Sequence, residues 1–424
     1  LTAVLVPVVM LASWHEADAE GRAPAFFAWT LALESFSLAV FAATDVFLFY
    51  VVFEATLIPA YFLIGGFGRL GRSRAAVKFL IYQLAGGLIM LASVIGLYVV
   101  SARDGNPSYL ISDLAAIDID VTTGRWIFVG FFIAFAIKAP MFPVHTWLAD
   151  TTEKATPGTS VLLVCILDKI GTFGMLRFCL GLLPEASQWA TPVVVVLALI
   201  SIVYGALVAI GQDDVLRLIG LTSLSHFGLI VLGIFVFSSQ GSSGAILYMV
   251  NHGLATALLF LVAGFLIRRS GTTLISRMGG IEKTAPVLAG SFLVAGLAAC
   301  GLPGLSPFVS EILVLISAFD YAPWAGAVAV TAIVLAAIYA LWMYQRTMTG
   351  PVRPEFATVV DLDRREVGVV APLILALVLF GFYPMPLLDV INPTVDTTLE
   401  QVGVSDDAPV VPAEGHGPGE EGQH

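Results

Sequence analysis

Apolar stretches long enough to cross a lipid bilayer recur along most of this chain and constrain its fold more than any other feature. A hydrocarbon core about 30 Å thick needs about 20 consecutive apolar residues in a helix. The chain has 58% hydrophobic and 12% charged residues, which excludes an ordinary soluble domain with its charged fraction of about 25%. We read eleven spans, at 25–43, 45–66, 77–100, 126–148, 158–182, 190–210, 213–237, 243–267, 285–318, 322–345 and 367–389. Spans of this length predict an all-α polytopic membrane protein rather than a β-barrel.

The two ends of the chain differ from these spans. Residues 1–12 are apolar but about half as long as a span requires, which predicts a partial transmembrane helix in a chain whose N-terminal helices are missing. Residues 390–424 end in a segment rich in Gly, Pro and Glu, which predicts an acidic disordered tail. The formal net charge of −11 indicates no nucleic-acid partner.

The three cysteines lie within predicted spans and lack CxxC spacing. They are Cys165, Cys179 and Cys300. Cysteine in an apolar span is typical of a small core residue, so we expect neither a metal site nor a redox cluster in this chain.

The basic residues separate onto the two sides of the predicted membrane. Alternating loops place fifteen of them on the side of the first loop and three on the opposite side, namely Arg103, Arg125 and Arg177. Because cytoplasmic loops carry the excess of Lys and Arg, the first side is predicted to be cytoplasmic and the C-terminal tail extracytoplasmic. The remaining two of the twenty basic residues, Lys138 and Lys169, fall inside the membrane.

Titratable side chains therefore lie at membrane depth. Each lysine is about twelve residues into its span, some 18 Å deep at 1.5 Å per residue. A charge there costs about 2.5–3.5 kcal/mol, so it requires a protein interior, water or a partner. Further titratable residues in the spans are Glu54, His226, His252 and Glu311. A single ion pair or a lone histidine could be purely structural, but this series favours a proton relay, because burial disfavours the charged forms and brings these groups toward proton exchange near neutral pH.

Proline and glycine interrupt two of the spans beside these charges. Pro140 and Pro143 follow Lys138, and the segment CGLPGLSPF at 300–308 precedes Glu311. Proline removes a backbone donor and breaks a helix, and irregular backbone at membrane depth persists only inside protein or beside water. Paired broken helices are typical of inverted-repeat transporters.

This pattern predicts an antiporter-like inverted-repeat helix bundle with broken helices at 126–148 and 285–318. The first part of the bundle, with the first half of the repeat, is expected at 25–182. The second half is expected at 190–345, and the last transmembrane helix at 367–389.

An ordered set of motifs resembles the antiporter-like membrane subunits of respiratory complex I, the proton-pumping NADH:quinone oxidoreductase. The resemblance runs from about residue 30 to 390. Within that family the chain is most similar to the subunit M (ND4-like) branch, because Glu311 stands where subunit L typically has lysine and no long lateral helix follows the last span. The motifs are FEATLIPAYFLIGGFG, FAIKAPMFPVHTWLAD, KIGTFGMLRF, LRLIGLTSLSHFG, NHGLATALLFLVAG and GLPGLSPFVSEIL.

The resemblance implies roles for individual residues. Glu54 would pair with Lys138, and Lys169 would be the central relay lysine. Glu311 would be the terminal proton-exchanging group, and the chain would move protons between these sites.

Other positions match the family less fully. His226 and His252 correspond to histidines that line a hydrated axis, and His145 corresponds to a histidine beside the first break, where it could be structural or a modulator. The usual WLPDAHxxAPT appears here as WLADTTEKATP, which puts the function of that loop in doubt. Asp168 stands where an apolar residue is common and could modulate Lys169 through space.

The resulting expectation is a proton-translocating subunit of NADH:quinone oxidoreductase, coupled at a distance to NADH oxidation and quinone reduction. The chain itself would carry no redox centre and no cofactor, because it has no nucleotide motif or cluster ligands. NADH, FMN, iron–sulfur clusters and quinone would belong to partner subunits. Expected partners are the L-type and N-type antiporter-like subunits and the lipid bilayer, in the bacterial inner (plasma) membrane.

Two alternatives remain open from the sequence. The chain could belong to a multisubunit cation/proton antiporter without a redox role. It could also be an inert scaffold, although a scaffold has no use for mid-membrane lysines that cost several kcal/mol.

Overall fold

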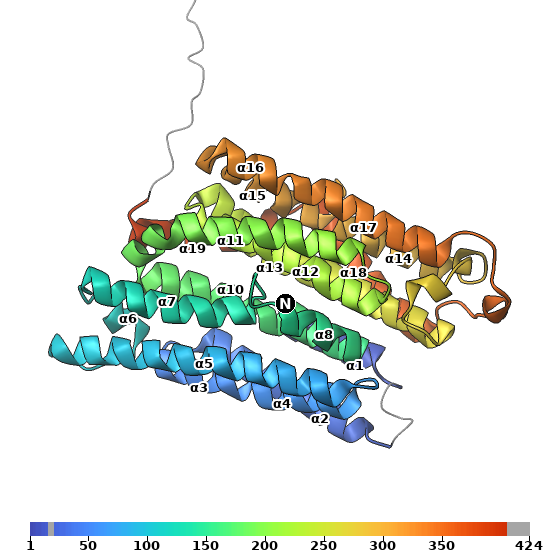
Figure 1. The fold of residues 1–424 in the computed structure, drawn as a ribbon, viewed down its shortest axis with the longest axis horizontal. Coiled ribbons are helices and arrows are strands. Elements are labelled where there is room, and N and C mark those ends of the chain that lie inside the picture. The colour runs from blue at the N-terminus through green and yellow to red at the C-terminus, as the bar shows by residue number, and fades with distance from the viewer. Residues whose placement is uncertain (16–20, 405–424) are drawn as a thin grey trace, which may run out of the picture.

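The computed structural model of the chain describes residues 1–15 and 21–404. Helices dominate, and most of them run roughly parallel to one another along the longest axis of the molecule (Figure 1). Within the described residues, β structure is limited to two isolated bridges. The predicted all-α membrane fold is therefore confirmed.

Ten helical spans in the described part of the chain are long and apolar enough to cross a membrane. They match ten of the eleven predicted spans, and the eleventh, at 285–318, is divided into the two shorter helices α14 (Pro286–Ala299) and α15 (Ser306–Tyr321). Seven spans are single helices: α2 (Ala23–Ala42), α5 (Arg72–Arg103), α7 (Val121–Lys138), α11 (Pro184–Ile210), α12 (Val215–Phe235), α13 (Ser239–Ser270) and α18 (Arg364–Phe382).

Three spans are built from consecutive helical segments. The first joins α3 (Val46–Ala55) to α4 (Leu57–Phe67), and another joins α16 (Pro323–Ala329) to α17 (Thr331–Met348). The third runs through α9 (Pro157–Val161), the π-helical segment η2 (Leu162–Leu167), α10 (Asp168–Gly174) and the π-helical segment η3 (Met175–Leu180). The α-helices that belong to none of these spans are α1 (Thr2–Ala12), α6 (Ile111–Leu114), α8 (Thr146–Lys154) and α19 (Met385–Val402), besides α14 and α15.

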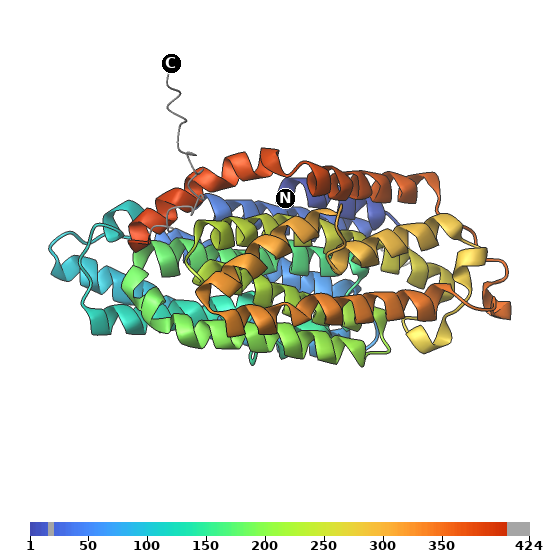
Figure 2. The same ribbon diagram turned by 90° about the horizontal axis from the view of Figure 1, so that it is seen from above.

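Helix α12 and the span from Pro157 to Leu180 form the centre of the bundle. Every residue of the most apolar window of α12 is buried, and 89% of the corresponding window of the Pro157–Leu180 span is buried. In α2 and α18 that fraction is 28%, and Figure 2 shows α18 and α19 along one outer side of the molecule. Polar and charged side chains inside a membrane need protein or water as partners. These partners are available in the centre of the bundle, so the central helices are where such side chains are expected.

The backbone between α7 and α8 is irregular at membrane depth. Helix α7 ends at Lys138, and Pro140 and Pro143 lie in the connection to Thr146. The indole Nε1 of Trp147 donates to the Ile137 carbonyl at 3.0 Å, and the Phe142 amide donates to Ser201 Oγ at 2.9 Å. These side chains satisfy backbone groups that have no helical partner once α7 ends at Lys138.

A second irregular connection joins α14 to α15. Gly301 and Gly304 have φ angles of +68° and +93°, which residues other than glycine rarely adopt. The Asn251 amide of α13 donates to the Ser306 carbonyl at 2.9 Å and to Ser310 Oγ at 2.7 Å. One side chain from a core helix thus holds the start of α15 in place.

The C-terminal region corrects two predictions. The last span was expected to run to residue 389, but α18 ends at Phe382, because Pro384 disfavours helical backbone at the preceding residue. Residues 390–402 were assigned to the disordered tail, but they belong to α19. The buried residues Ile391, Val395, Leu399 and Val402 recur at nearly helical spacing and pack α19 onto the bundle. Residues 405–424 lie outside the described part of the chain.

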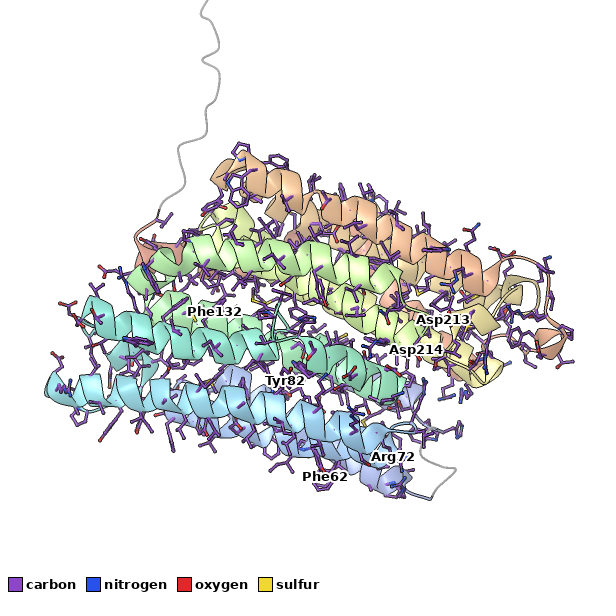
Figure 3. All side chains as sticks on the ribbon, in the orientation of Figure 1. Phe62, Arg72, Tyr82, Phe132, Asp213 and Asp214 are labelled. Carbon is purple, nitrogen blue, oxygen red and sulfur yellow. The ribbon has the colours of Figure 1, made fainter. Side chains whose placement is uncertain are left out.

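The predicted cytoplasmic loops lie together at one end of the bundle. Figure 3 places Arg72, Asp213 and Asp214 at that end. Ion pairs connect these loops, for example Arg346 with Asp213 at 2.9 Å. The division of the chain into two repeat halves and the missing N-terminal helices stay predictions.

Candidate functional site

Lys138 is the last residue of α7 and is only 1% exposed. Its Nζ donates to Thr56 Oγ1 at 3.3 Å and lies 4.5 Å from the centre of the Phe53 ring. The Glu54 carboxylate interacts electrostatically with Lys138, although the ammonium donates its side-chain hydrogen bond to Thr56. Both groups of the predicted pair therefore lie in one neighbourhood, and their direct pairing stays a prediction.

Glu54 lies where two helices meet, since α3 ends at Ala55 and α4 begins at Leu57. Gly87 of α5 faces it so closely that a Cβ atom at position 87 would overlap the Glu54 carboxylate. The Glu54 Oε1 atom is buried and has no hydrogen-bond partner among the described residues. The absence of a side chain at Gly87 thus leaves room for the Glu54 carboxylate, whose Oε1 atom can still accept a hydrogen bond.

Lys169 lies in the centre of the bundle, between the π-helical segments η2 and η3. Its Nζ is 2.6 Å from His252 Nδ1 and donates to the Val164 carbonyl at 3.1 Å. It also lies 4.4 Å from the centre of the Phe227 ring. A π-helical segment changes helix register, a feature that occurs often at functional sites.

The two histidines continue from Lys169 toward Glu311. The rings of His252 and His226 are edge to face, with centroids 5.1 Å apart. His226 Nε2 lies 3.0 Å from the hydroxyl of Tyr339, and the hydroxyl of Tyr248 donates a short hydrogen bond to Glu311 Oε1. The structure thus brings Lys169, both histidines and Glu311 into one buried, connected group.

Asp168 lies next to Lys169 in the chain and is 1% exposed. It interacts electrostatically with Lys169 and with Lys138, so it stands within reach of both lysines. Its Oδ2 is buried without a hydrogen-bond partner in the part of the chain that the structure describes. The carboxylate is therefore positioned to influence both parts of the predicted relay.

His145 lies apart from this group, directly before α8. Its ring centroid is 6.0 Å from that of Phe142 and 5.3 Å from that of Tyr204. These aromatic contacts place His145 at the irregular connection between α7 and α8. It is close to Lys138 in the sequence, but these ring contacts are not with residues of the predicted relay.

Four residues that touch the predicted relay were not identified from the sequence pattern: Thr56, Gly87, Tyr248 and Tyr339. Tyr248 precedes His252 by four residues and so shares its helix face, a signal that could have identified it. Gly87 and Tyr339 face their partners across helices, and spacing along one chain gives no signal for such contacts.

Charged residues also form a network around α8. The Asp150 carboxylate accepts from Lys78 at 2.6 Å and from Arg217 at 2.7 Å, and Arg217 also binds Glu153 at 2.8 Å. Burial raises the pKa of the Asp150 carboxyl, but hydrogen bonds and charge from Lys78 and Arg217 outweigh burial, so its pKa lies below the usual range. This network joins α8 to α5 and α12.

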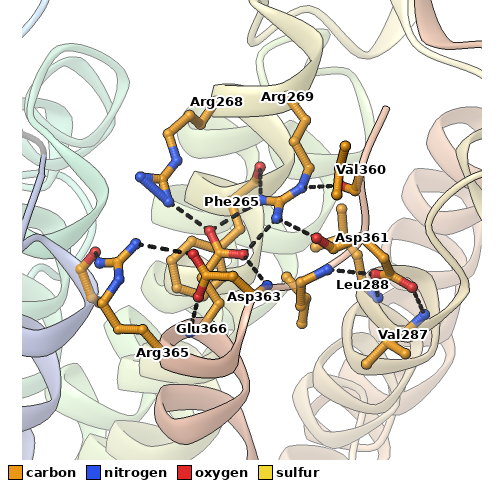
Figure 4. Close-up of polar contacts among 12 residues, drawn as sticks. Phe265, Arg268, Arg269, Val287, Leu288, Val360, Asp361, Asp363, Arg365 and Glu366 are labelled. Carbon is orange, nitrogen blue, oxygen red and sulfur yellow. Dashed lines mark hydrogen bonds and ion pairs between the residues drawn. The ribbon is translucent and has the colours of Figure 1, made fainter. Parts of the chain in front are cut away.

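A second network, shown in Figure 4, joins the end of α13 to the start of α18. Glu366 is 1% exposed and binds Arg268 at 2.6 Å and Arg269 at 2.5 Å. Asp363 and Glu366 also form a capping box, and Asp361 accepts from the first amides of α14, at 2.7 Å from Val287. These contacts satisfy helix ends and fix the loop before α18.

The three cysteines are buried and free. Among the described residues, no group of three or more His, Cys, Asp or Glu side chains is arranged to hold a metal ion.

Comparison with known proteins gives concordant results. Residues 43–336 match the sequence model of the family described as NADH:quinone oxidoreductase/Mrp antiporter, transmembrane. NADH-quinone oxidoreductase subunit M of Mycobacterium tuberculosis (strain CDC 1551 / Oshkosh) is 50% identical over 465 aligned positions, covering 100% of this chain and 84% of that protein.

Two solved structures extend this comparison. A chain of respiratory complex I from Thermus thermophilus superimposes with a TM-score of 0.88 at 36% identity, covering 95% of this chain and 85% of that one. A chain of the Mrp complex from Dietzia sp. DQ12-45-1b superimposes with a TM-score of 0.82 at 23% identity, covering 95% and 84%. At that identity the second match shows a shared fold alone.

Proposed function

Because the chain belongs to the NADH:quinone oxidoreductase/Mrp antiporter family, as an antiporter-like subunit M of the oxidoreductase, we propose a route for the protons that it moves. The route is a mid-membrane relay of carboxylate, ammonium and imidazole groups. Its residues, in order, are Glu54, Lys138, Lys169, His252, His226 and Glu311.

The hydrogen bond between Lys169 and His252, at 2.6 Å, is the observation that carries this proposal. A buried ammonium normally requires an anionic partner, whereas imidazole is a neutral base that can accept its proton. The distance lies within the range for direct proton transfer between heavy atoms. The contact joins α10 to α13, so it connects the lysine to the histidines of the second part of the bundle.

The relay would work through electrostatics at a distance. A change of charge arriving along the membrane arm would alter the contact between Glu54 and Lys138, and Asp168 is within electrostatic reach of both lysines. The altered field would move a proton from Lys169 to His252 and on toward Glu311. Buried atoms without a protein partner, such as Glu54 Oε1, support internal water as a bridge at the wider gaps.

The energy source would lie in partner subunits, which would hold NADH, FMN, iron–sulfur clusters and quinone. The neighbours of this chain would be the L-type and N-type antiporter-like subunits of the membrane arm. The basic residues support an orientation in a bacterial inner membrane with the end of α19 on the extracytoplasmic side.

The first test replaces Lys138 with Met in the assembled complex and measures NADH-driven acidification of inverted membrane vesicles. Lys138→Met removes the charge at nearly constant volume, so proton pumping should fall by at least about tenfold. Lys283→Met is the matched control, because Lys283 is exposed at the end of the short 3-10 helix Ile281–Lys283. NADH oxidation with ferricyanide reports the amount of assembled complex.

Pumping at the normal rate by the Lys138→Met complex would overturn the relay. Sodium-dependent proton exchange by the chain without NADH would instead support the rival antiporter function.

A further inference from the structure

The proposed relay has a gap between His226 and Glu311. The two residues belong to α12 and α15, and no hydrogen bond links them directly in the described part of the chain. His226 reaches Tyr339, whereas Glu311 reaches Tyr248. Each of the two relay residues therefore has a tyrosine hydroxyl as its hydrogen-bond partner on the side of the gap.

Both tyrosines are buried among the core helices. Tyr248 of α13 is 1% exposed and Tyr339 of α17 is 2% exposed. A buried hydroxyl without a partner costs free energy that phenylalanine would not. Each hydroxyl here has a partner, and both partners are titratable residues of the relay.

The phenol groups also lie close to one another. Tyr339 interacts electrostatically with Tyr248 and with Glu311, and the rings of His226 and Tyr248 have centroids 6.0 Å apart. Four helices, α12, α13, α15 and α17, thus direct one polar side chain each into the same buried region.

A hydroxyl can pass a proton without carrying net charge. It accepts a proton on its oxygen and releases its own hydrogen to the next acceptor, so each transfer conserves protons and leaves a neutral phenol. A neutral hydroxyl is therefore compatible with the carboxylate of Glu311 at the end of the relay. An ammonium in the same place would form an ion pair with the carboxylate and keep it deprotonated.

Glu311 is confined between two different surroundings. Its Oε1 faces Tyr248, whereas its Oε2 lies where a Cβ atom at position 301 would be, beside the irregular connection of α14 and α15. One oxygen therefore faces the relay and the other faces the break. This arrangement lets the carboxyl receive a proton on one side and release it on the other.

From these contacts we propose that the hydroxyls of Tyr339 and Tyr248 are the proton-transferring link between His226 and Glu311. This inference rests on the proposed relay. The proton would move from His226 Nε2 to the Tyr339 oxygen, the Tyr339 hydrogen would move to Tyr248 directly or through one water, and the Tyr248 hydrogen would move to Glu311 Oε1.

The test compares Tyr248→Phe and Tyr339→Phe in the assembled complex with Tyr344→Phe. Tyr344 lies on the same helix as Tyr339, is partly buried and packs against Phe292 at 6.5 Å between ring centroids. Phenylalanine keeps the ring and removes only the hydroxyl. Each relay variant should lower NADH-driven pumping in inverted vesicles by at least about tenfold, while Tyr344→Phe pumps normally.

A readout that a structural anchor would not change completes the test. In a complex with 3-fluorotyrosine at position 248, the ring shape and the hydroxyl remain, but the hydroxyl is more acidic. A link in the relay then shifts the pH profile of pumping, whereas an anchoring hydroxyl leaves it unchanged. This variant also serves if a phenylalanine variant does not assemble.

Normal pumping by both phenylalanine variants, together with an unshifted profile for the fluorotyrosine complex, would overturn the tyrosine link. If Lys138→Met abolishes pumping in the same experiment, the relay itself stands and only this link fails. If Lys138→Met also pumps normally, the proposed function has failed instead.

Discussion

Lys138 and Lys169 share an environment that would let an ammonium exchange its proton inside a membrane, as the proposed relay requires. Each lies over a phenylalanine ring, at 4.5 Å and 4.4 Å from its centre, and each has a neutral side chain as its hydrogen-bond partner. A desolvated cation–π contact contributes about 2 kcal/mol, which offsets much of the cost of a charge at this depth, about 2.5–3.5 kcal/mol. A direct ion pair would hold the proton more firmly than this arrangement does.

At the same scale, glycine controls the position of Glu54. A Cβ atom at position 87 would come within 3.0 Å of three atoms of the Glu54 carboxyl group, so Gly87→Ala must displace that carboxylate. Because a shift of about 1 Å can cost as much as a hundredfold in rate, we expect proton pumping to fall by about tenfold or more.

The control for this prediction is Gly66→Ala, since no atom lies within 4 Å of a Cβ placed at position 66. Both variants are compared by NADH-driven acidification, normalised to ferricyanide reduction. Equal pumping by the two alanine variants would show that the placement of Glu54 does not limit transport.

At the scale of helices, each mid-membrane charge lies at an irregularity of the backbone. Glu54 is next to the junction of α3 and α4, and Lys138 is the last residue of α7. Lys169 follows one π-helical segment and precedes another, and Glu311 lies in α15 just beyond the second irregular connection. Irregular backbone presents carbonyl and amide groups that a regular helix would use internally, so these sites are the ones that water can hydrate.

The sequence predicted some of these irregularities and not others, for a physical reason. Proline beside Lys138 and the glycines and prolines at 300–308 before Glu311 are local signals, because they remove donors or allow unusual backbone angles. The π-helical segments around Lys169 contain neither proline nor glycine, so they carry no such local signal. Helix α19 was missed because its apolar residues are spaced by about four in an otherwise polar segment.

The candidate site shows the same limit. Lys138, Lys169, Glu311 and the histidines stand out because titratable residues are rare in apolar spans. Tyr339 does not stand out, because tyrosine is common in membrane proteins and only the fold brings it next to His226.

The network around α8 makes a prediction at the scale of that helix. Because the pKa of the Asp150 carboxyl lies below its usual range in the folded chain, the group stabilises the fold above the unfolded pKa of about 3.9 and loses that effect as pH falls through its folded pKa. Asp150→Asn should therefore lower the unfolding temperature of the complex by about 1–2 °C at pH 7.

The difference from the wild type should begin to shrink below about pH 4 and vanish once the pH lies below the folded pKa of Asp150. Thermal unfolding in detergent across that pH range measures it, with the exposed Asp104 changed to Asn as control. A difference that stays constant with pH would assign the effect of Asp150→Asn to packing rather than charge.

At the scale of the whole molecule, the relay follows the most buried helices. Lys169, His226 and His252 lie on three spans whose most apolar windows are 83–100% buried, whereas only 28% of that window is buried in the outer helices α2 and α18. The bundle thus surrounds a polar interior with apolar helices that can face lipid or neighbouring subunits. This arrangement agrees with a proton path through the interior of the bundle.

The central claim is that protons pass through this one route, and the number of protons pumped per NADH oxidised tests it most directly. Proteoliposomes carrying the complex with Lys169→Met, Glu311→Gln or both changes give this ratio alongside the pumping rate. If both residues serve one route, each single change lowers pumping to the same level and the double change lowers it no further. Wild-type pumping with either change, or losses that add in the double variant, would contradict the account.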